Sequence, residues 1–192
     1  MNSIKEYKYA YRAYWKLLFY SNQTNPEDFF DDLSVYPTIK SEKVYSNIQE
    51  ESERPRSGKF EFLLEYPELN GYNRWKQNNF PLNEEESNNI KADGYEEIHI
   101  SWRNYNWGGL IKSSSQFALI DGSVGNSAWY YAIGYTGKSH VWSGGTPGPY
   151  SLIHEVFLWI RINMHPDMFS LSKKRSLYLK YQLFYTIVII IN

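Results

Sequence analysis

The amino-acid sequence predicts a mainly β protein, an antiparallel β-sandwich of jelly-roll type preceded by a short N-terminal helical segment. Apolar and polar residues alternate in several short runs after residue 58, which is typical of strands with one buried face. Turns rich in Gly and Pro separate these runs, and no helix-sized crossover lies between them, as in a sandwich or barrel. The chain also holds 18 Tyr and 7 Trp, residues that favour strands.

Three parts are predicted. Residues 1–48 form an N-terminal helical extension, residues 58–162 the β-sandwich domain, and residues 163–192 a peripheral C-terminal tail. The polar segment 49–58, QEESERPRSG, marks the first boundary, because charged residues with Pro and Gly are typical of linkers.

The N-terminal extension has helical periodicity. Ser3 and Glu6 have the spacing of a capping box. Apolar residues then recur at three- and four-residue steps: Ile4, Tyr7, Tyr11, Tyr14 or Trp15, and Leu18. This stripe predicts a helix over residues 4–20. Asn25-Pro26-Glu27-Asp28 predicts the start of a second helix.

The sandwich domain shows the period of strands. Strands are predicted at 60–66, 72–76, 95–102, 110–112, 117–120, 129–133 and 153–162. The final strand is centred on Leu158. The alternation predicts eight core residues: Phe60, Phe62, Leu64, Ile98, Ile100, Val156, Leu158 and Ile160.

Composition limits the classes of partner. The net charge of −1 gives no reason to expect nucleic acid or a membrane surface, so we expect a glycan or protein partner. With no cysteine, neither a disulfide framework nor a Cys-based zinc site can form, and no cofactor is predicted. The same lack, and the charged N-terminal residues, favour the cytoplasm.

The end of the sequence allows three interpretations. Residues 181–191, YQLFYTIVIII, are apolar or weakly polar. They are short of the roughly 20 apolar residues that a spanning helix needs. An added strand, a marginal tail anchor and a disordered tail all remain open.

Glycine-flanked loops between the later strands have the richest chemistry. Six residues there are predicted to bind a ligand: Arg103, Asn104, Trp107, Asp121, Asn126 and Trp142. A sugar ring can stack on an indole while amides and a guanidinium bond its hydroxyls. We expect these loops to converge at one end of the sandwich, since recognition residues concentrate in loops on a rigid scaffold. Tryptophans that only cap the core are the alternative.

Other chemistry is less well supported. Asp121 and Asn126 could be oxygen ligands for calcium, although Asp121-Gly122 is also a strong turn sequence, and no metal site is predicted. The four histidines show no HExxH spacing. No GxSxG motif is present, and the run Glu84-Glu85-Glu86 fits a solvated loop. We predict no catalytic residue and no enzymatic activity.

Residues 60–162 resemble the discoidin-like (factor V/VIII type C) and other galactose-binding-like modules. The similarity lies in Tyr72-Asn73-Arg74-Trp75, in the run WYYAIG at 129–134, and in the Arg-containing final strand EVFLWIRI at 155–162. It implies a jelly-roll sandwich with a ligand site in the loops at one end and no catalysis. The disulfide that often links the ends of such modules cannot form here.

Two functions follow as hypotheses. The first is a non-catalytic, lectin-like module that binds a carbohydrate or glycoconjugate. The alternative is a protein–protein interaction domain that uses the N-terminal aromatic segment or the sandwich loops.

Overall fold

The computed structural model of the chain describes residues 6–22, 39–40, 44–52, 57–83, 91–102, 107–112, 118–122, 124, 130–134 and 146–163. Within these residues the fold is mainly antiparallel β, as predicted. Residues 1–161 belong to one compact unit, and the second unit, from Ile162, is described only to residue 163.

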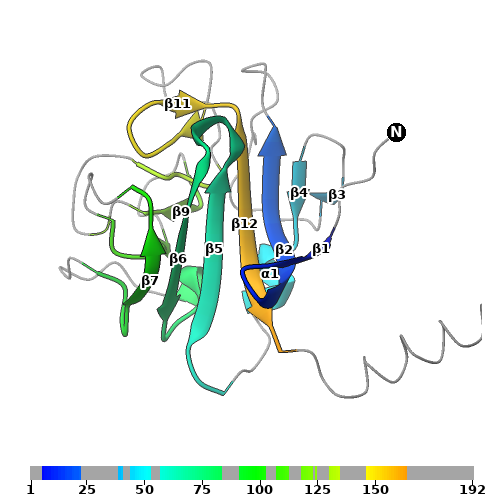
Figure 1. Cartoon of the computed structure of the whole chain (residues 1–192), viewed down its shortest axis with the longest axis vertical. Coiled ribbons are helices and arrows are strands. Elements are labelled where there is room, and N and C mark those ends of the chain that lie inside the picture. The colour runs from blue at the N-terminus through cyan, green and yellow to red at the C-terminus, as the bar shows by residue number, and fades with distance from the viewer. Residues whose placement is uncertain are drawn as a thin grey trace, which may run out of the picture. The chain divides into compact units, whose positions relative to one another are not determined.

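Most strands belong to one large sheet (Figure 1). Its members are β1 (Tyr7–Ala10), β2 (Ala13–Asn22), β3 (Ile39–Lys40), β4 (Val44–Ser46), β5 (Phe60–Tyr66), β6 (Gly71–Gln77), β7 (Glu96–Ile100) and β12 (Glu155–Ile162). The order across the sheet is β3-β4-β2-β12-β5-β6-β7, and β1 pairs with β2 beside this path. The last described strand of the chain therefore lies between the early strands β2 and β5.

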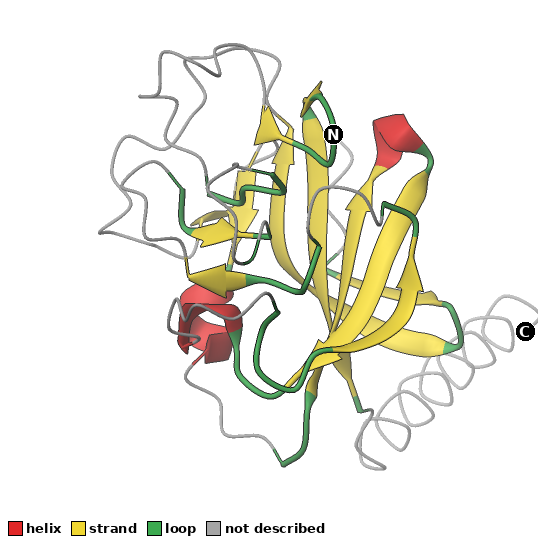
Figure 2. Cartoon of the chain, turned by 90° about the vertical axis from the view of Figure 1, so that its left-hand side faces the viewer, coloured by secondary structure: helices red, strands yellow, loops and turns green. Residues whose placement is uncertain are grey.

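Smaller elements complete the described part. Two short ribbons pair β8 (Ile111–Lys112) with β9 (Ile120–Asp121), and β10 (Thr146–Pro147) with β11 (Leu152–Ile153). The helical turns are α1 (Ile48–Ser52), η2 (Pro67–Leu69) and η3 (Pro81–Asn83). Figure 2 shows the large sheet from the side, with short strands and loops gathered on one side of it.

The face of the sheet toward these loops, here called the inner face, carries the main core. Phe62 and Leu64 of β5 and Leu158 of β12 are fully buried there. Side chains from the covering segments pack against them: Ile48, Phe80, Trp102, Trp107, Leu110, Ile120, Tyr131 and Ile133.

The opposite face, here called the outer face, is also partly buried. It carries a second apolar cluster that includes Trp15 and Leu17 of β2, Leu63 of β5 and Trp159 of β12. The β1–β2 hairpin contributes to the cover of this face, because Ala10 packs against the cluster. Burial on both faces explains why β2 is apolar at nearly every position.

The predicted helix over residues 4–20 is wrong for its described part. Residues 7–10 and 13–22 are the strands β1 and β2. The three- and four-residue spacing is a coincidence within a strand buried on both faces, which has a nearly continuous apolar sequence instead of a simple alternation. The second predicted helix start, at residues 25–28, lies outside the described residues.

The predicted boundary at residues 49–58 does not separate two units. β2 and β4 share one sheet with β5 and β12, and residues on both sides of the boundary belong to the same compact unit. The tail from residue 164 onward lies outside the described residues. In the described part, no helix is long and apolar enough to cross a membrane.

Most predicted core positions are confirmed, and one is wrong. Phe62, Leu64, Ile100, Val156, Leu158 and Ile160 are buried, and Phe60 packs against the same core. Ile98 is instead 39% exposed. The pairing of β6 with β7 shifts between Arg74 and Trp75, so that Arg74 faces His99 and Trp75 faces Glu97. Such an irregularity leaves one residue out of register, which accounts for the exposure of Ile98.

This difference predicts unequal costs for two similar truncations. We expect Leu158→Ala to lower the free energy of unfolding by about 2–5 kcal/mol, because it opens a cavity in the core. Ile98→Ala should cost about 0.5 kcal/mol, since Ile98 lies on the surface. Urea unfolding of both variants checks this, and equal losses would place Ile98 in the core after all.

Candidate functional site

The turn of the β1–β2 hairpin has an unusual backbone. Ala10 pairs with Ala13, which leaves Tyr11 and Arg12 as a two-residue loop. Their φ angles are +51° and +59°. Positive φ at both central positions is the type I′ turn that suits a hairpin, and Asn-Gly is its usual sequence because larger side chains are strained there.

Left-handed conformations cost about 1–2 kcal/mol for each residue other than Gly. A Tyr-Arg turn therefore persists because the surrounding structure holds it, and residues in such conformations are frequent at binding sites. The strain directs attention to where the turn places Tyr11.

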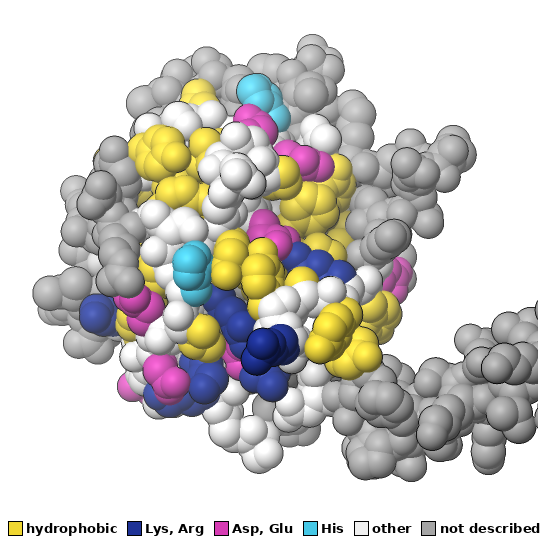
Figure 3. Space-filling view, viewed as in Figure 1, with side chains coloured by type: hydrophobic (Ala, Val, Ile, Leu, Met, Phe, Trp, Pro, Cys, Tyr) yellow, Lys and Arg dark blue, Asp and Glu magenta, His cyan; other side chains and the backbone are white. Residues whose placement is uncertain are grey.

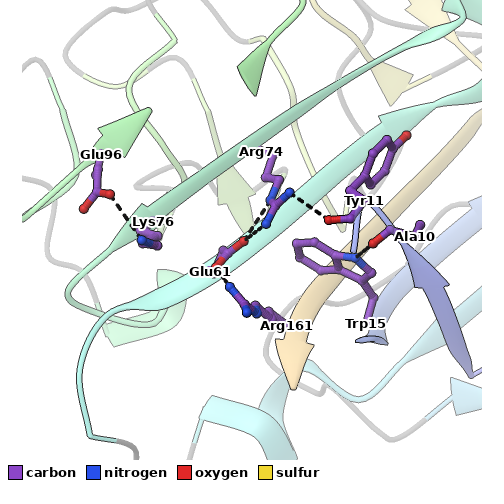
Figure 4. Close-up of polar contacts among 8 residues, drawn as sticks. All are labelled: Ala10, Tyr11, Trp15, Glu61, Arg74, Lys76, Glu96 and Arg161. Carbon is purple, nitrogen blue, oxygen red and sulfur yellow. Dashed lines mark hydrogen bonds and ion pairs between the residues drawn. The ribbon is translucent and has the colours of Figure 1, made fainter. Parts of the chain in front are cut away.

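Tyr11 lies over the outer face of the sheet. Its ring is 4.3 Å from the ring of Tyr72 on β6. Its backbone oxygen accepts a hydrogen bond of 3.3 Å from Nη1 of Arg74 (Figure 4). Arg74 also lies 5.3 Å from the centre of the Trp15 ring. The turn is thus held by the side chains of the sheet beneath it.

A hollow of about 510 Å³ opens beside Tyr11. We call it the Tyr11 hollow. Its walls are formed by nine residues: Tyr11, Glu65, Tyr66, Pro67, Asn70, Gly71, Tyr72, Phe157 and Trp159. Figure 3 shows the same face of the molecule, on which hydrophobic side chains gather beside basic and acidic ones. The volume is within the range of about 300–1,000 Å³ that is usual for small-molecule sites.

The turn at one side of the hollow is fixed to β12. Asn70 ends the η2 turn in the left-handed conformation, which Asn tolerates better than most residues. Glu68 accepts backbone hydrogen bonds of 2.7 and 2.9 Å from His154 and Glu155. The walls that come from β5, β6 and β12 are therefore tied together at this end of the sheet.

Glu65 is the polar centre of the hollow. Its Oε2 accepts a hydrogen bond of 2.8 Å from Nε1 of Trp159 and also forms an ion pair with Nζ of Lys8. The Lys8 ammonium lies 4.2 Å from the centre of the Trp159 ring. Burial lowers the pKa of Lys8, and the Glu65 carboxylate opposes this effect. The Lys8 ammonium thus binds one oxygen of the Glu65 carboxylate and the face of the Trp159 ring.

The pKa of the Tyr11 hydroxyl is shifted by the same surroundings. Burial raises its pKa to about 12, and the nearby Glu65 carboxylate and Tyr72 add to the rise. The Tyr11 hydroxyl therefore keeps its proton at neutral pH and donates it in a hydrogen bond to the Glu65 carboxylate.

The aromatic wall continues past Tyr72. His99 of β7 stacks on Tyr72 with ring centres 4.3 Å apart and an angle of 29°. Ser101 Oγ lies 3.2 Å from Nε2 of His99 and accepts a 3.2 Å hydrogen bond from the backbone N–H of Tyr72. The rings of Tyr72 and His99 and the hydroxyl of Ser101 thus lie next to one another on this part of the outer face.

A second acidic centre, Glu61, lies on the same face of β5. Its Oε1 pairs with Arg74 and its Oε2 with Arg161, each at 2.6 Å (Figure 4). Further toward the sheet edge, Lys76 pairs with Glu96. Within the described part of the chain, both oxygens of Glu61 therefore hold a cation, whereas Glu65 is paired with the single cation Lys8.

The predicted loop site is described only in part. Trp107 is 8% exposed and packs edge-on against Trp75 and Tyr131 at 4.7 and 4.8 Å. It is a core residue, not an exposed stacking platform. Asp121 is half-buried at the end of β9. Four further predicted site residues lie outside the described residues: Arg103, Asn104, Asn126 and Trp142. A site that uses them stays a prediction.

The outer-face residues were missed by the sequence reasoning. Tyr11 was assigned to a helical stripe, and Phe157 and Trp159 to a strand whose other face drew attention. The period of two was itself informative, because it places Glu61 with Glu65, Tyr72 with Arg74, and Phe157 with Trp159. These positions combine aromatic rings with charged groups on one strand face.

The strained turn generates a test. We expect Arg12→Gly to raise the free energy of unfolding by about 1 kcal/mol, because glycine adopts positive φ without a steric cost. Urea unfolding measures it. Arg12→Ala keeps the strain and serves as the control, and an equal effect of both changes would show that the φ angle stores little energy.

Comparison with family models, curated proteins and solved structures finds no match for this chain. The resemblance to discoidin-like modules therefore stays a prediction.

Proposed function

We propose that this chain is a carbohydrate-binding module, and that the Tyr11 hollow on the outer face of the sheet holds the glycan. The observation that carries the proposal is the strained turn that presents Tyr11 above Tyr72 at the mouth of the hollow. The contact of the Tyr11 ring with Tyr72 offsets part of the strain of a Tyr-Arg pair at positions that favour Asn-Gly. A ligand contact made by the exposed part of Tyr11 would offset more of it.

The wall chemistry suits a sugar. The apolar face of a pyranose packs on aromatic rings, and Tyr11, Tyr72 and Phe157 supply rings at the hollow. Hydroxyl groups need a few well-placed polar partners, which Glu65, Asn70 and the Tyr11 hydroxyl offer. Tyr11 is 39% exposed, so part of its surface is free to be covered by a ligand.

The proposal includes binding without catalysis. Most glycoside hydrolases use two carboxyl groups that flank the scissile bond. Among the described residues that line the hollow, Glu65 alone carries a carboxylate, and it is paired with Lys8. We further propose a sandwich of jelly-roll type, in which the segment with β8 and β9 belongs to the second layer over the inner face.

One observation favours the alternative, a protein-interaction domain. Six large hydrophobic side chains are exposed among the described residues, and four of them, Tyr7, Tyr9, Tyr11 and Tyr14, belong to the β1–β2 hairpin. Exposed rings gathered on one element are common at protein interfaces. This alternative uses the hairpin itself, while the first proposal uses the hollow under its turn.

A pair of tyrosine substitutions separates the two proposals. We expect Tyr11→Ala to weaken glycan binding about two- to tenfold, since an aromatic contact contributes about 0.5–1.5 kcal/mol. Tyr9→Ala removes a ring that is 63% exposed on the same hairpin but does not line the hollow, so glycan affinity should stay the same. A glycan array identifies the ligand, and calorimetry measures both variants.

Urea unfolding of both variants verifies that the fold is intact. Equal affinity in the wild type and Tyr11→Ala would contradict the hollow as the site. No glycan bound at all, with a protein partner lost in Tyr9→Ala, would replace the first proposal by the second.

A further inference from the structure

The Glu65 carboxylate in the Tyr11 hollow limits the kinds of sugar that would fit there. Glu65 is the one charged side chain among the described residues that line the hollow. No cationic side chain stands among the described residues that line the hollow, and Lys8 beside it is already paired with Glu65. The carboxylate or sulfate of an acidic sugar would therefore lack a positively charged partner there.

A cation of the same chain already binds at the edge of the hollow. The Lys8 ammonium binds Glu65 Oε2 and lies over the face of Trp159, with 4.2 Å to the ring centre. A carboxylate beside aromatic faces is an arrangement that attracts ammonium groups, both through charge and through the negative ring face. Lys8 is an internal example of such a group at the edge of the hollow.

Glu61 provides a comparison within the same strand face. It pairs with two cations, Arg74 on Oε1 and Arg161 on Oε2. Glu65, four residues further along β5, pairs with Lys8 on Oε2. A carboxylate offers about four acceptor positions. Within the described part of the chain, Glu65 accepts hydrogen bonds from the Lys8 ammonium, the neutral Trp159 indole and the neutral Tyr11 hydroxyl. Glu61 pairs with two cations of the chain itself. Glu65 has an acceptor position left at which a ligand could supply the second cation.

We propose that the ligand is an amino sugar, a glycan whose free amine reaches Glu65 inside the Tyr11 hollow while its ring packs on Tyr11, Tyr72 or Phe157. This inference rests on the proposed function and names its substrate class. The amine adds a charge-assisted hydrogen bond, which is stronger than a bond between neutral groups. Lys8 remains on Oε2, so that the carboxylate bridges two ammonium groups as Glu61 bridges two guanidinium groups.

The test compares two ligands that differ only at nitrogen. A β-1,4-linked glucosamine hexamer carries free amines, and its fully N-acetylated counterpart has the same rings without the charge. Calorimetry on the full chain, in mildly acidic buffer that keeps the sugar amines protonated, should give an affinity about tenfold higher for the amine form. Equal affinities, or a preference for the acetylated form, would overturn the inference while leaving carbohydrate binding intact.

A matched pair of variants assigns the preference to a residue. We expect Glu65→Gln to remove the preference for the amine form, since the amide keeps the shape without the charge. Glu96→Gln removes the same charge from an exposed position near the sheet edge, and it should keep the preference. If Glu65→Gln unfolds, as urea titration would show, Tyr72→Ala should weaken both hexamers together when the ligand lies in the hollow.

Three further results would overturn the amino-sugar inference. If the wild type binds neutral glycans but neither hexamer, the amino-sugar inference fails and the proposed function stands. If no glycan of any class binds, both fail. A lysine-containing peptide that binds in place of the amine hexamer, and loses affinity in Glu65→Gln, would overturn the sugar while assigning the ammonium site to a protein ligand.

Discussion

The burial of both faces of the large sheet is the constraint on which the other features depend. The inner face packs against the core, and the outer face carries Trp15, Leu17, Leu63 and Trp159, which also have to be removed from water. The β1–β2 hairpin contributes part of this cover. Because the hairpin lies over the outer face, Lys8 reaches Glu65 and Tyr11 reaches Tyr72. The same arrangement that covers an apolar surface thus also forms one wall of the hollow.

The charged residues of the outer face extend this arrangement. Glu61 and Glu65 alternate with the buried Leu63 along β5, so each carboxylate projects beside apolar rings and needs a cationic partner there. Arg74 meets this need at Glu61 and also holds the backbone of Tyr11. One side chain therefore joins the charge balance of the sheet to the strained turn. Through Arg74, the ion pair of Glu61 and the backbone conformation of the turn are therefore coupled.

The sequence predicted the β class, the strands β5, β6, β7 and β12 and most of the core, because strands with one buried face alternate in a recognisable way. β5 and β12 show this best, with Phe62, Leu64, Leu158 and Ile160 all buried. The predicted strand at 129–133 is wrong for its described part, in which only Ile133 forms an isolated bridge. The prediction also failed at β2, because a strand buried on both faces loses the alternation and can imitate a helical stripe. Ile98 was misplaced because an irregular pairing depends on the partner strand. The hollow could not be predicted, because Glu65, Tyr72 and Trp159 come together only through the order of β5, β6 and β12 in the sheet. Tyr11 joins them only because the β1–β2 hairpin lies over the outer face.

The sheet order has a consequence for how the chain reaches its folded state. β12 is the last described strand to be synthesised, yet it separates β2 from β5. Until it arrives, two apolar strands have open edges at the centre of the unfinished sheet, and such edges invite pairing with other chains. The contact between β2 and β12 spans more than 130 residues of sequence, and closing so long a loop slows folding. Assembly of the sheet is therefore delayed until nearly all of the described chain has left the ribosome, and production of the protein should depend on whatever shields those edges in the meantime.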